Sequence, residues 1–93
     1  MKIICVGRNY VNHIIELENK HPKNPLIFFK NSECLSNIKL FSMPQFSNNI
    51  HHEVELVFKI CKSGKNIKVN DTKEYISHIA LGIDFTARDI QNE

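Results

Sequence analysis

The stretch that decides the fold runs from His51 to Cys61 and reads HHEVELVFKIC. Side chains in a β-strand alternate between its two faces with period two. Glu53 and Glu55 therefore share one face, and the other face carries the apolar side chains Val54, Leu56, Phe58 and Ile60. We expect a long strand whose apolar face packs on a core and whose opposite face carries an acidic pair.

The acidic pair has two interpretations. Carboxylates a few ångströms apart repel each other unless solvent or a cation separates them, and hard divalent cations prefer carboxylate oxygens. The pair then belongs to a metal site. Alternatively it lies on the solvated outer face of an antiparallel strand, because such sheets commonly expose one side. The pair alone leaves both interpretations open.

Composition limits the class of protein. The 93 residues suffice for at most one small domain, and 42% hydrophobic with 24% charged residues indicates a globular chain. The net charge is +2 and the twelve Lys and Arg are scattered, which argues against nucleic-acid or membrane-surface binding. No apolar run is nearly as long as the roughly 20 residues that a membrane-spanning helix needs. The segment Met1 to Val6 is too short for the apolar region of a signal peptide, so we expect a cytoplasmic location.

The three cysteines, Cys5, Cys34 and Cys61, are widely spaced and form no C-x-x-C pair. Without paired spacing they give little support to a zinc site. We expect reduced and mostly buried thiols that behave as small hydrophobic side chains.

Short apolar runs on both sides of the central stretch predict further strands. These runs cover residues 2–6, 26–29, 38–41 and 77–83. Asn70 to Thr72 predicts the cap of a short helical turn through Tyr75 and Ile76, in the connection between the last two strands.

A helix is expected over residues 10–18, with Asn9 as its N-cap. His13 and Glu16 are three residues apart and therefore neighbours on one helix face, where the carboxylate could orient or charge the imidazole. The alternative is an ordinary surface pair. The following loop, residues 19–25, holds Pro22 and Pro25 and suits a mobile lid.

A third carboxylate, Asp84, follows the predicted strand at residues 77–83. Thr86 and Asp89 have capping-box-like spacing, which predicts that a helix starts at Ala87. Asp84 would then sit at the junction of strand and helix, where a carboxylate is well placed to be a ligand. The alternative roles for a single aspartate there are a turn residue and a helix N-terminal charge.

Four segments together resemble the fumarylacetoacetate hydrolase family. They are Cys5-Val6-Gly7-Arg8-Asn9-Tyr10 with His13 and Glu16, then Phe28-Phe29-Lys30, then His52-Glu53-Val54-Glu55-Leu56, and Asp84-Phe85-Thr86-Ala87-Arg88-Asp89-Ile90-Gln91. They occur in the family's order and cover most of the chain. The resemblance is closest to the small single-domain acylpyruvate hydrolases and oxaloacetate decarboxylases or tautomerases.

The resemblance implies an α+β fold, a mixed β-roll of the fumarylacetoacetate hydrolase type. It also implies a divalent metal, usually Mg²⁺ with Mn²⁺ or Ca²⁺ as alternatives, held by the carboxylates that match Glu53, Glu55 and Asp84. His13 and Glu16 match the family's water-activating pair, carried on a segment that closes over the substrate.

The implied reaction is Mg²⁺-dependent hydrolysis of a carbon–carbon bond in a small 2-oxo or 1,3-dioxo acid such as an acylpyruvate. The alternatives are an oxaloacetate decarboxylase or tautomerase, and a non-catalytic, truncated metal-binding remnant. Arg8, Arg88 and Gln91 are candidates for binding the remote end of the substrate. Arg88 has the alternative role of a structural ion-pair partner.

The chain also departs from the family pattern. Family members continue past the motif at residues 84–91 with more of the β-roll, a lysine that helps to polarise the substrate and a Thr-Gly-Thr-Pro-like loop. Residues 1–93 contain none of these, so we expect them to be the N-terminal portion of a single catalytic domain. Such a portion would have uncovered apolar faces and exposed sheet edges. The complete domain is expected to be a homodimer.

Overall fold

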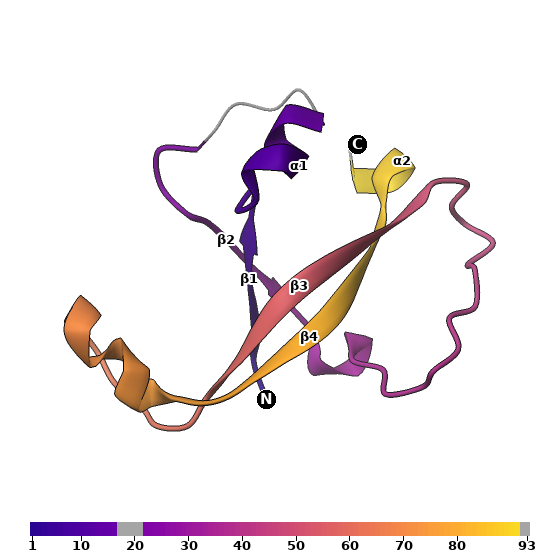
Figure 1. Ribbon diagram of the computed structural model, residues 1–93. Helices are drawn as coiled ribbons and strands as arrows, with labels where there is room; N and C mark the ends of the chain where they lie inside the picture. Colours follow the sequence, from indigo (N-terminus) through magenta and orange to yellow (C-terminus); the bar gives the residue numbers. More distant parts are fainter. Residues whose placement is uncertain (17–21, 92–93) are drawn as a thin grey trace. The chain divides into compact units, whose positions relative to one another are not determined.

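The computed structural model describes residues 1–16 and 22–91, apart from the side chains of Val11, His13 and Glu16. The chain divides into two compact units, Met1–Phe41 and Ser42–Glu93, which we describe separately (Figure 1). Among the described residues, no helix has the length and apolar character needed to cross a membrane.

The first unit contains a two-stranded antiparallel sheet. Strand β1 (Ile3–Gly7) pairs with β2 (Leu26–Lys30) along its whole length. Helix α1 (Val11–Glu16) follows β1, and a single 3₁₀ turn, η1 (Ser32–Cys34), follows β2. Asn31 caps η1, because its side-chain oxygen accepts a hydrogen bond of 3.2 Å from the backbone N–H of Glu33.

The second unit is built on a longer antiparallel ribbon. Strand β3 (Ile50–Ile60) pairs with β4 (Ile76–Ala87), and the 3₁₀ helix η2 (Val69–Tyr75) lies in the connection between them (Figure 1). The register shifts once, between Lys59 and Ile60. A short helix, α2 (Arg88–Gln91), continues directly from the end of β4.

The ribbon has two chemically different faces. In the antiparallel register Val54 lies opposite Ile83, Leu56 opposite Leu81 and Phe58 opposite Ile79, so one face is apolar on both strands. On the other face Glu53 lies opposite Asp84 and Glu55 opposite Gly82. Directly opposed residues of an antiparallel pair project to the same side, so the pairing unites the acidic side chains of both strands.

The burial of the ribbon is the reverse of the expected pattern. Glu53, Glu55 and Asp84 are half-buried, whereas Leu56 is 50% exposed and Leu81 77% exposed. The expectation that the apolar face of β3 packs on a core is therefore wrong for the structure described. A two-stranded ribbon has no second layer of its own to cover that face.

Other expectations about burial are corrected in the same way. In the part of the chain that is described, Ile14 at 5% exposure is the one buried hydrophobic side chain. Cys34 and Cys61 are exposed and Cys5 is half-buried, so the thiols are reduced as expected but are not mostly buried. Two separate two-stranded sheets enclose too little space for a larger core.

Two expected boundaries also differ. Residues 38–41 form no strand, because each described sheet has only two strands and offers no partner for their backbone groups. Asp84 lies inside β4 and not at its end, since pairing with β3 extends β4 as far as Ala87, opposite Ile50. The predicted lid loop at residues 19–25 includes residues 19–21, which lie outside the described part.

The described elements place the protein in the α+β class, with strands as the main component. The helix expected at residues 10–18 is present as α1 over Val11–Glu16, and its last two residues fall outside the described part. The expected helical turn before the last strand is present as η2.

Candidate metal centre

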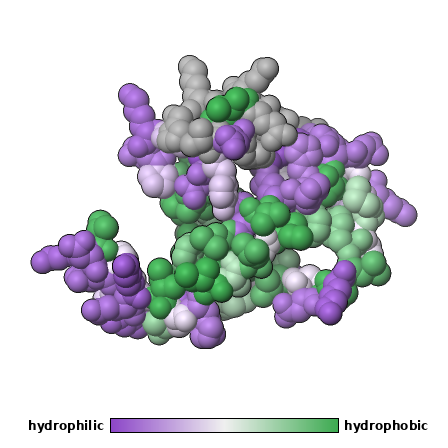
Figure 2. Space-filling view, in the orientation of Figure 1, coloured by the Kyte–Doolittle hydropathy of each residue, from purple (hydrophilic) through white to green (hydrophobic). Residues whose placement is uncertain are grey.

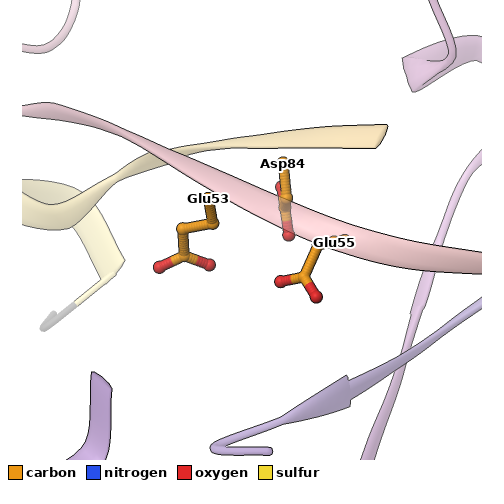
Figure 3. Close-up of side chains that lie close together, drawn as sticks. All are labelled: Glu53, Glu55 and Asp84. Atoms are coloured by element: carbon orange, nitrogen blue, oxygen red, sulfur yellow. The ribbon is translucent and has the colours of Figure 1, made fainter. Parts of the chain in front are cut away.

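Three carboxylates gather on the acidic face of the ribbon. One oxygen each from Glu53, Glu55 and Asp84 can be chosen so that all three lie within 4.8 Å of one another. Figure 3 shows the three side chains on the same side of the ribbon, two from β3 and one from β4. The register explains this arrangement, because Glu53 faces Asp84 across the ribbon and Glu55 is the next residue of β3 on that face.

The donor set suits a hard divalent cation. Three half-buried carboxylates at this separation repel one another, and a cation between them would remove the repulsion. Mg²⁺, Mn²⁺ and Ca²⁺ prefer oxygen ligands of this kind, whereas zinc sites are dominated by sulfur and nitrogen. The residues present therefore fit the metal that the sequence predicts.

Gly82 contributes to the site by having no side chain. It lies opposite Glu55 on the acidic face. A Cβ atom added there would come 3.0 Å from Cγ2 of Val57, closer than van der Waals contact normally allows. A glycine at this point therefore avoids crowding Val57, which lies on the same face of β3 two residues after Glu55.

Arg88 is the cationic neighbour of the cluster. Its guanidinium forms an ion pair with Oε1 of Glu53, and the two side chains are only 11% and 20% exposed. Its Nε donates a hydrogen bond of 3.2 Å to Nδ1 of His51, and its Nη1 donates to Oε1 of Gln91. Of the two roles predicted for Arg88, these contacts correspond to the structural ion-pair partner.

Helix α2 is held against the turn that precedes β3. Oδ1 of Asp89 accepts a hydrogen bond of 2.6 Å from the hydroxyl of Ser47, and Oδ2 accepts one of 3.0 Å from the backbone N–H of Asn48. The backbone N–H of Arg88 donates to the carbonyl of Asn49 at 2.8 Å. The Ser47 hydrogen bond, followed by that from Asn48, lowers the pKa of Asp89. These contacts fix the backbone from which Arg88 reaches Glu53.

Sequence reasoning missed His51 and Ser47 as parts of this network. The signal for His51 was available, because residues 51, 53 and 55 share a strand face by simple alternation. Ser47 gave no such signal. Its contact with Asp89 joins residues 42 positions apart in the sequence. The contact can be recognised only in the structure, where the pairing of β3 with β4 brings the start of β3 close to the end of β4.

The remaining candidates lie in the first unit. His13 and Glu16 belong to α1, and their side chains are not among those described. Arg8 lies in the turn after β1, where its backbone has a φ of 51° in the left-handed region. It lines a hollow of about 240 Å³ together with residues 6, 7, 9 and 22–25. The relation of these residues to the carboxylates stays a prediction.

The comparisons with known proteins agree on one family. The family model described as "Fumarylacetoacetate (FAA) hydrolase C-terminal" matches residues 2–93. A mitochondrial oxaloacetate tautomerase from Caenorhabditis elegans is 42% identical over 99% of this chain and 44% of its own length. A mitochondrial oxaloacetate decarboxylase from Dictyostelium discoideum is 41% identical over 98% of this chain and 43% of its own.

A solved structure shows the same similarity. The crystal structure of a putative fumarylacetoacetate isomerase/hydrolase from Oleispira antarctica matches with a TM-score of 0.89 and 38% identity. The match covers 98% of this chain and 41% of that chain. The chain thus spans less than half the length of the curated relatives and of the solved structure that it matches.

Proposed function

Since the chain belongs to the fumarylacetoacetate hydrolase family, we propose that it carries the metal-binding part of an enzyme that converts oxaloacetate or a closely related 2-oxo acid. The observation that carries the proposal is the convergence of Glu53, Glu55 and Asp84 within 4.8 Å. In this proposal the three carboxylates hold one divalent cation, most simply Mg²⁺.

The relatives favour oxaloacetate over an acylpyruvate. Those reported above are named as an oxaloacetate tautomerase and an oxaloacetate decarboxylase, and neither name mentions hydrolysis of an acylpyruvate. We therefore place tautomerisation or decarboxylation ahead of the hydrolysis that we first expected. Both kinds of substrate are small 2-oxo acids, so the same oxygen-rich site suits either.

A bound cation would supply positive charge to the enolate that develops at the 2-oxo oxygen in either reaction. The chain's own residues have separate tasks. Glu53 and Asp84 hold the cation from opposite strands, and Arg88 keeps the Glu53 carboxylate in place. Fixed charges of this kind need little rearrangement as the reaction proceeds.

We assign proton movement to His13, oriented by Glu16, on the basis of the family pattern. In tautomerisation the imidazole takes a proton from C3 of oxaloacetate, and a proton is returned to the 2-oxo oxygen to give the enol. In decarboxylation the bond between C3 and the C4 carboxylate breaks, CO₂ leaves and C3 is protonated. Neither reaction needs an attacking water, whereas hydrolysis of an acylpyruvate does.

Two predictions extend to the complete domain. We propose that it is a homodimer, and that Arg8, Arg88 and Gln91 help to bind the substrate. A cytoplasmic location also stays a prediction, and the relatives named above are mitochondrial proteins.

A chimera tests the proposed function. Residues 1–93 would replace the matching segment of the nematode tautomerase, and enol–keto conversion and CO₂ release would be measured with Mg²⁺. We expect Mg²⁺-dependent conversion of oxaloacetate that is lost in Glu55→Gln and retained in Glu74→Gln, an exposed glutamate of η2. A folded, metal-binding chimera that leaves oxaloacetate unchanged and cleaves an acylpyruvate would contradict the proposal.

A further inference from the structure

We propose that Ser47 and Asp89 are positioning residues of the candidate metal centre. The hydrogen bond between them holds helix α2 so that the guanidinium of Arg88 stays on the carboxylate of Glu53. Their importance for the reaction rests on the proposed function, in which Glu53 is a metal ligand. The positioning itself needs neither metal nor substrate, so it can be tested without them.

Helix α2 is too short to hold its own orientation. It has four residues, Arg88–Gln91, and a single helical turn is unstable by itself because helix nucleation is costly. Apolar packing does little to fix it, since Ile90 is 44% exposed. Figure 2 likewise shows hydrophobic residues at the surface over the part of the view where the ribbon lies. Polar contacts must therefore set the direction of the side chains on α2.

Ser47 makes the most buried of these contacts. It is 5% exposed and is the one buried polar side chain in the described part of the chain. A buried hydroxyl is costly unless it forms hydrogen bonds. The Ser47 hydroxyl donates one of 2.6 Å to Oδ1 of Asp89 and accepts one of 3.2 Å from the backbone N–H of Asn49. These two bonds indicate a fixed connection between α2 and the turn before β3.

Asp89 carries this connection to Arg88. Oδ2 of Asp89 accepts a hydrogen bond of 3.0 Å from the backbone N–H of Asn48, so the same turn contacts both carboxylate oxygens. The backbone N–H of Arg88 donates to the carbonyl of Asn49 at 2.8 Å. An arginine side chain loses much rotamer freedom when it is held in one place. A fixed backbone therefore favours the arrangement in which the guanidinium reaches Glu53.

NMR of the arginine side chain tests the proposal. Exchange of the Arg88 Nε–H proton with water would be measured in the metal-free 93-residue chain. We expect slow exchange in the unchanged chain and about tenfold faster exchange in Ser47→Ala, the scale of losing one hydrogen bond to a charged group. Ser47→Thr keeps a hydroxyl and should restore slow exchange. Asp89→Asn keeps the shape of the side chain but cannot accept two hydrogen bonds from the turn, so it should also speed exchange.

Ser77→Ala is the matched control. It removes a hydroxyl that donates to the carbonyl of Lys59, at the opposite end of β4 from α2, and it should leave the exchange of Arg88 unchanged. Circular dichroism would check that each variant is folded at the temperature of the measurement. A residue with a purely structural role would lower the unfolding temperature and leave the exchange in the folded chain unchanged.

Mn²⁺ affinity shows whether Ser47 acts through Arg88. Ser47→Ala should lower the affinity by about tenfold or less, as expected for residues that orient a metal ligand. In a chain that already carries Arg88→Gln, the same substitution should cause no further loss, because residues that act through one contact are not additive.

Unchanged exchange of the Arg88 proton in both Ser47→Ala and Asp89→Asn would overturn the proposal, as would equal acceleration by Ser77→Ala. A further loss of Mn²⁺ affinity in the Arg88→Gln chain would also overturn it, because Ser47 would then act by another route. If the unchanged chain bound no Mn²⁺, the proposed function would fail, and the exchange rates would still decide whether Ser47 and Asp89 position Arg88.

Discussion

Arg88 connects the start of α2 to the acidic face of the ribbon. It contacts Glu53, His51 and Gln91 at once, which requires the branched guanidinium and its several donors. Lysine carries the same charge on a single nitrogen and cannot reproduce that arrangement. The contacts therefore indicate that Arg88 positions Glu53 by geometry as well as by charge.

Replacing Arg88 with lysine should separate geometry from charge. We expect the Mn²⁺ affinity of the chain to fall by about tenfold, the lower end of the range for residues that orient a metal ligand. Mn²⁺ binding can be followed by electron paramagnetic resonance. Arg8→Lys is the same substitution in the other unit and should leave the affinity unchanged. An unchanged affinity in Arg88→Lys would mean that Glu53 does not depend on Arg88 for its position.

Ser47 should control the ionisation of Asp89. Its hydroxyl is the largest cause of the lowered pKa, so Ser47→Ala should raise the pKa of Asp89 toward its ordinary value of 3.8. A carboxyl group with a lowered pKa stabilises the folded state above its ordinary pKa, and this stabilisation is lost as the pH falls through the lowered value. The stabilising contact is therefore present at neutral pH and lost in acid.

Carbon-detected NMR of the Asp89 carboxyl group measures this directly. Ser36→Ala is the matched control, because Ser36 accepts a local hydrogen bond from Ile38 in the other unit. Titration of Asp89 at the same pH in Ser47→Ala and in the unchanged chain would contradict the assignment.

Single residues were predictable from the sequence where alternation alone places them. Period two was sufficient to put Glu53 and Glu55 on one face of a strand. The approach of Asp84 to Glu53 depends on the antiparallel register of β3 and β4, which the sequence pattern does not specify. Asp84 was identified from its position at a predicted junction of strand and helix, and it was expected at the end of the strand, three residues before the actual end at Ala87.

Among the secondary-structure elements, strands with strong local patterns were predicted correctly. Strands β1 and β2 occur where apolar runs predicted them, and β3 occurs where the alternating pattern predicted it. The run at residues 38–41 is equally apolar but forms no strand. A strand requires a partner for its backbone groups as well as an apolar sequence, and the described part of the chain provides none. Local propensity cannot reveal that a partner is missing.

Gly82 offers a test of the ribbon as an element. A valine there would crowd Val57, since even a Cβ atom would lie 3.0 Å from Cγ2 of that residue, and it would place methyl groups directly across the ribbon from Glu55. We expect Gly82→Val to lower Mn²⁺ affinity by about tenfold, as for other changes next to metal ligands. The strands should persist, because valine favours extended backbone.

Ala80→Val is the control for this substitution. Ala80 lies on the same face of β4, opposite Val57 and one step further from the carboxylates. It should retain the affinity of the parent chain. Equal losses in the two variants would mean that crowding of Val57, and not the methyl groups across from Glu55, determines the affinity.

At the scale of the whole molecule, the exposed apolar face dominates the energetics. A large aliphatic or aromatic side chain contributes roughly 1.5–3 kcal/mol when it is fully buried, and a folded domain has a net stability of about 5–15 kcal/mol. Leaving the six side chains of the paired face largely exposed therefore removes stabilisation comparable to the whole net stability. Composition counts apolar residues but does not show whether anything covers them. It therefore predicted a globular chain and could not predict how little of the chain is buried.

The division into two units was not predictable from composition either. Residues 1–41 and 42–93 form separate compact units, yet the hydrophobic content of the sequence does not change sharply from one segment to the other. The expectation of an N-terminal portion came from motifs that the family has and residues 1–93 lack. The chain spans 44% and 43% of the length of the two relatives, and the assignment to one portion of a single catalytic domain stays a prediction.

The central claim is that one divalent cation binds to the carboxylates that β3 and β4 bring together. Titration of the 93-residue chain with Mn²⁺, followed by electron paramagnetic resonance, tests it most directly. We predict one tight site per chain, lost in Asp84→Asn and in Glu55→Gln and retained in the control Asp71→Asn, which alters an aspartate of η2. Tight binding that survives both Asp84→Asn and Glu55→Gln would contradict the claim.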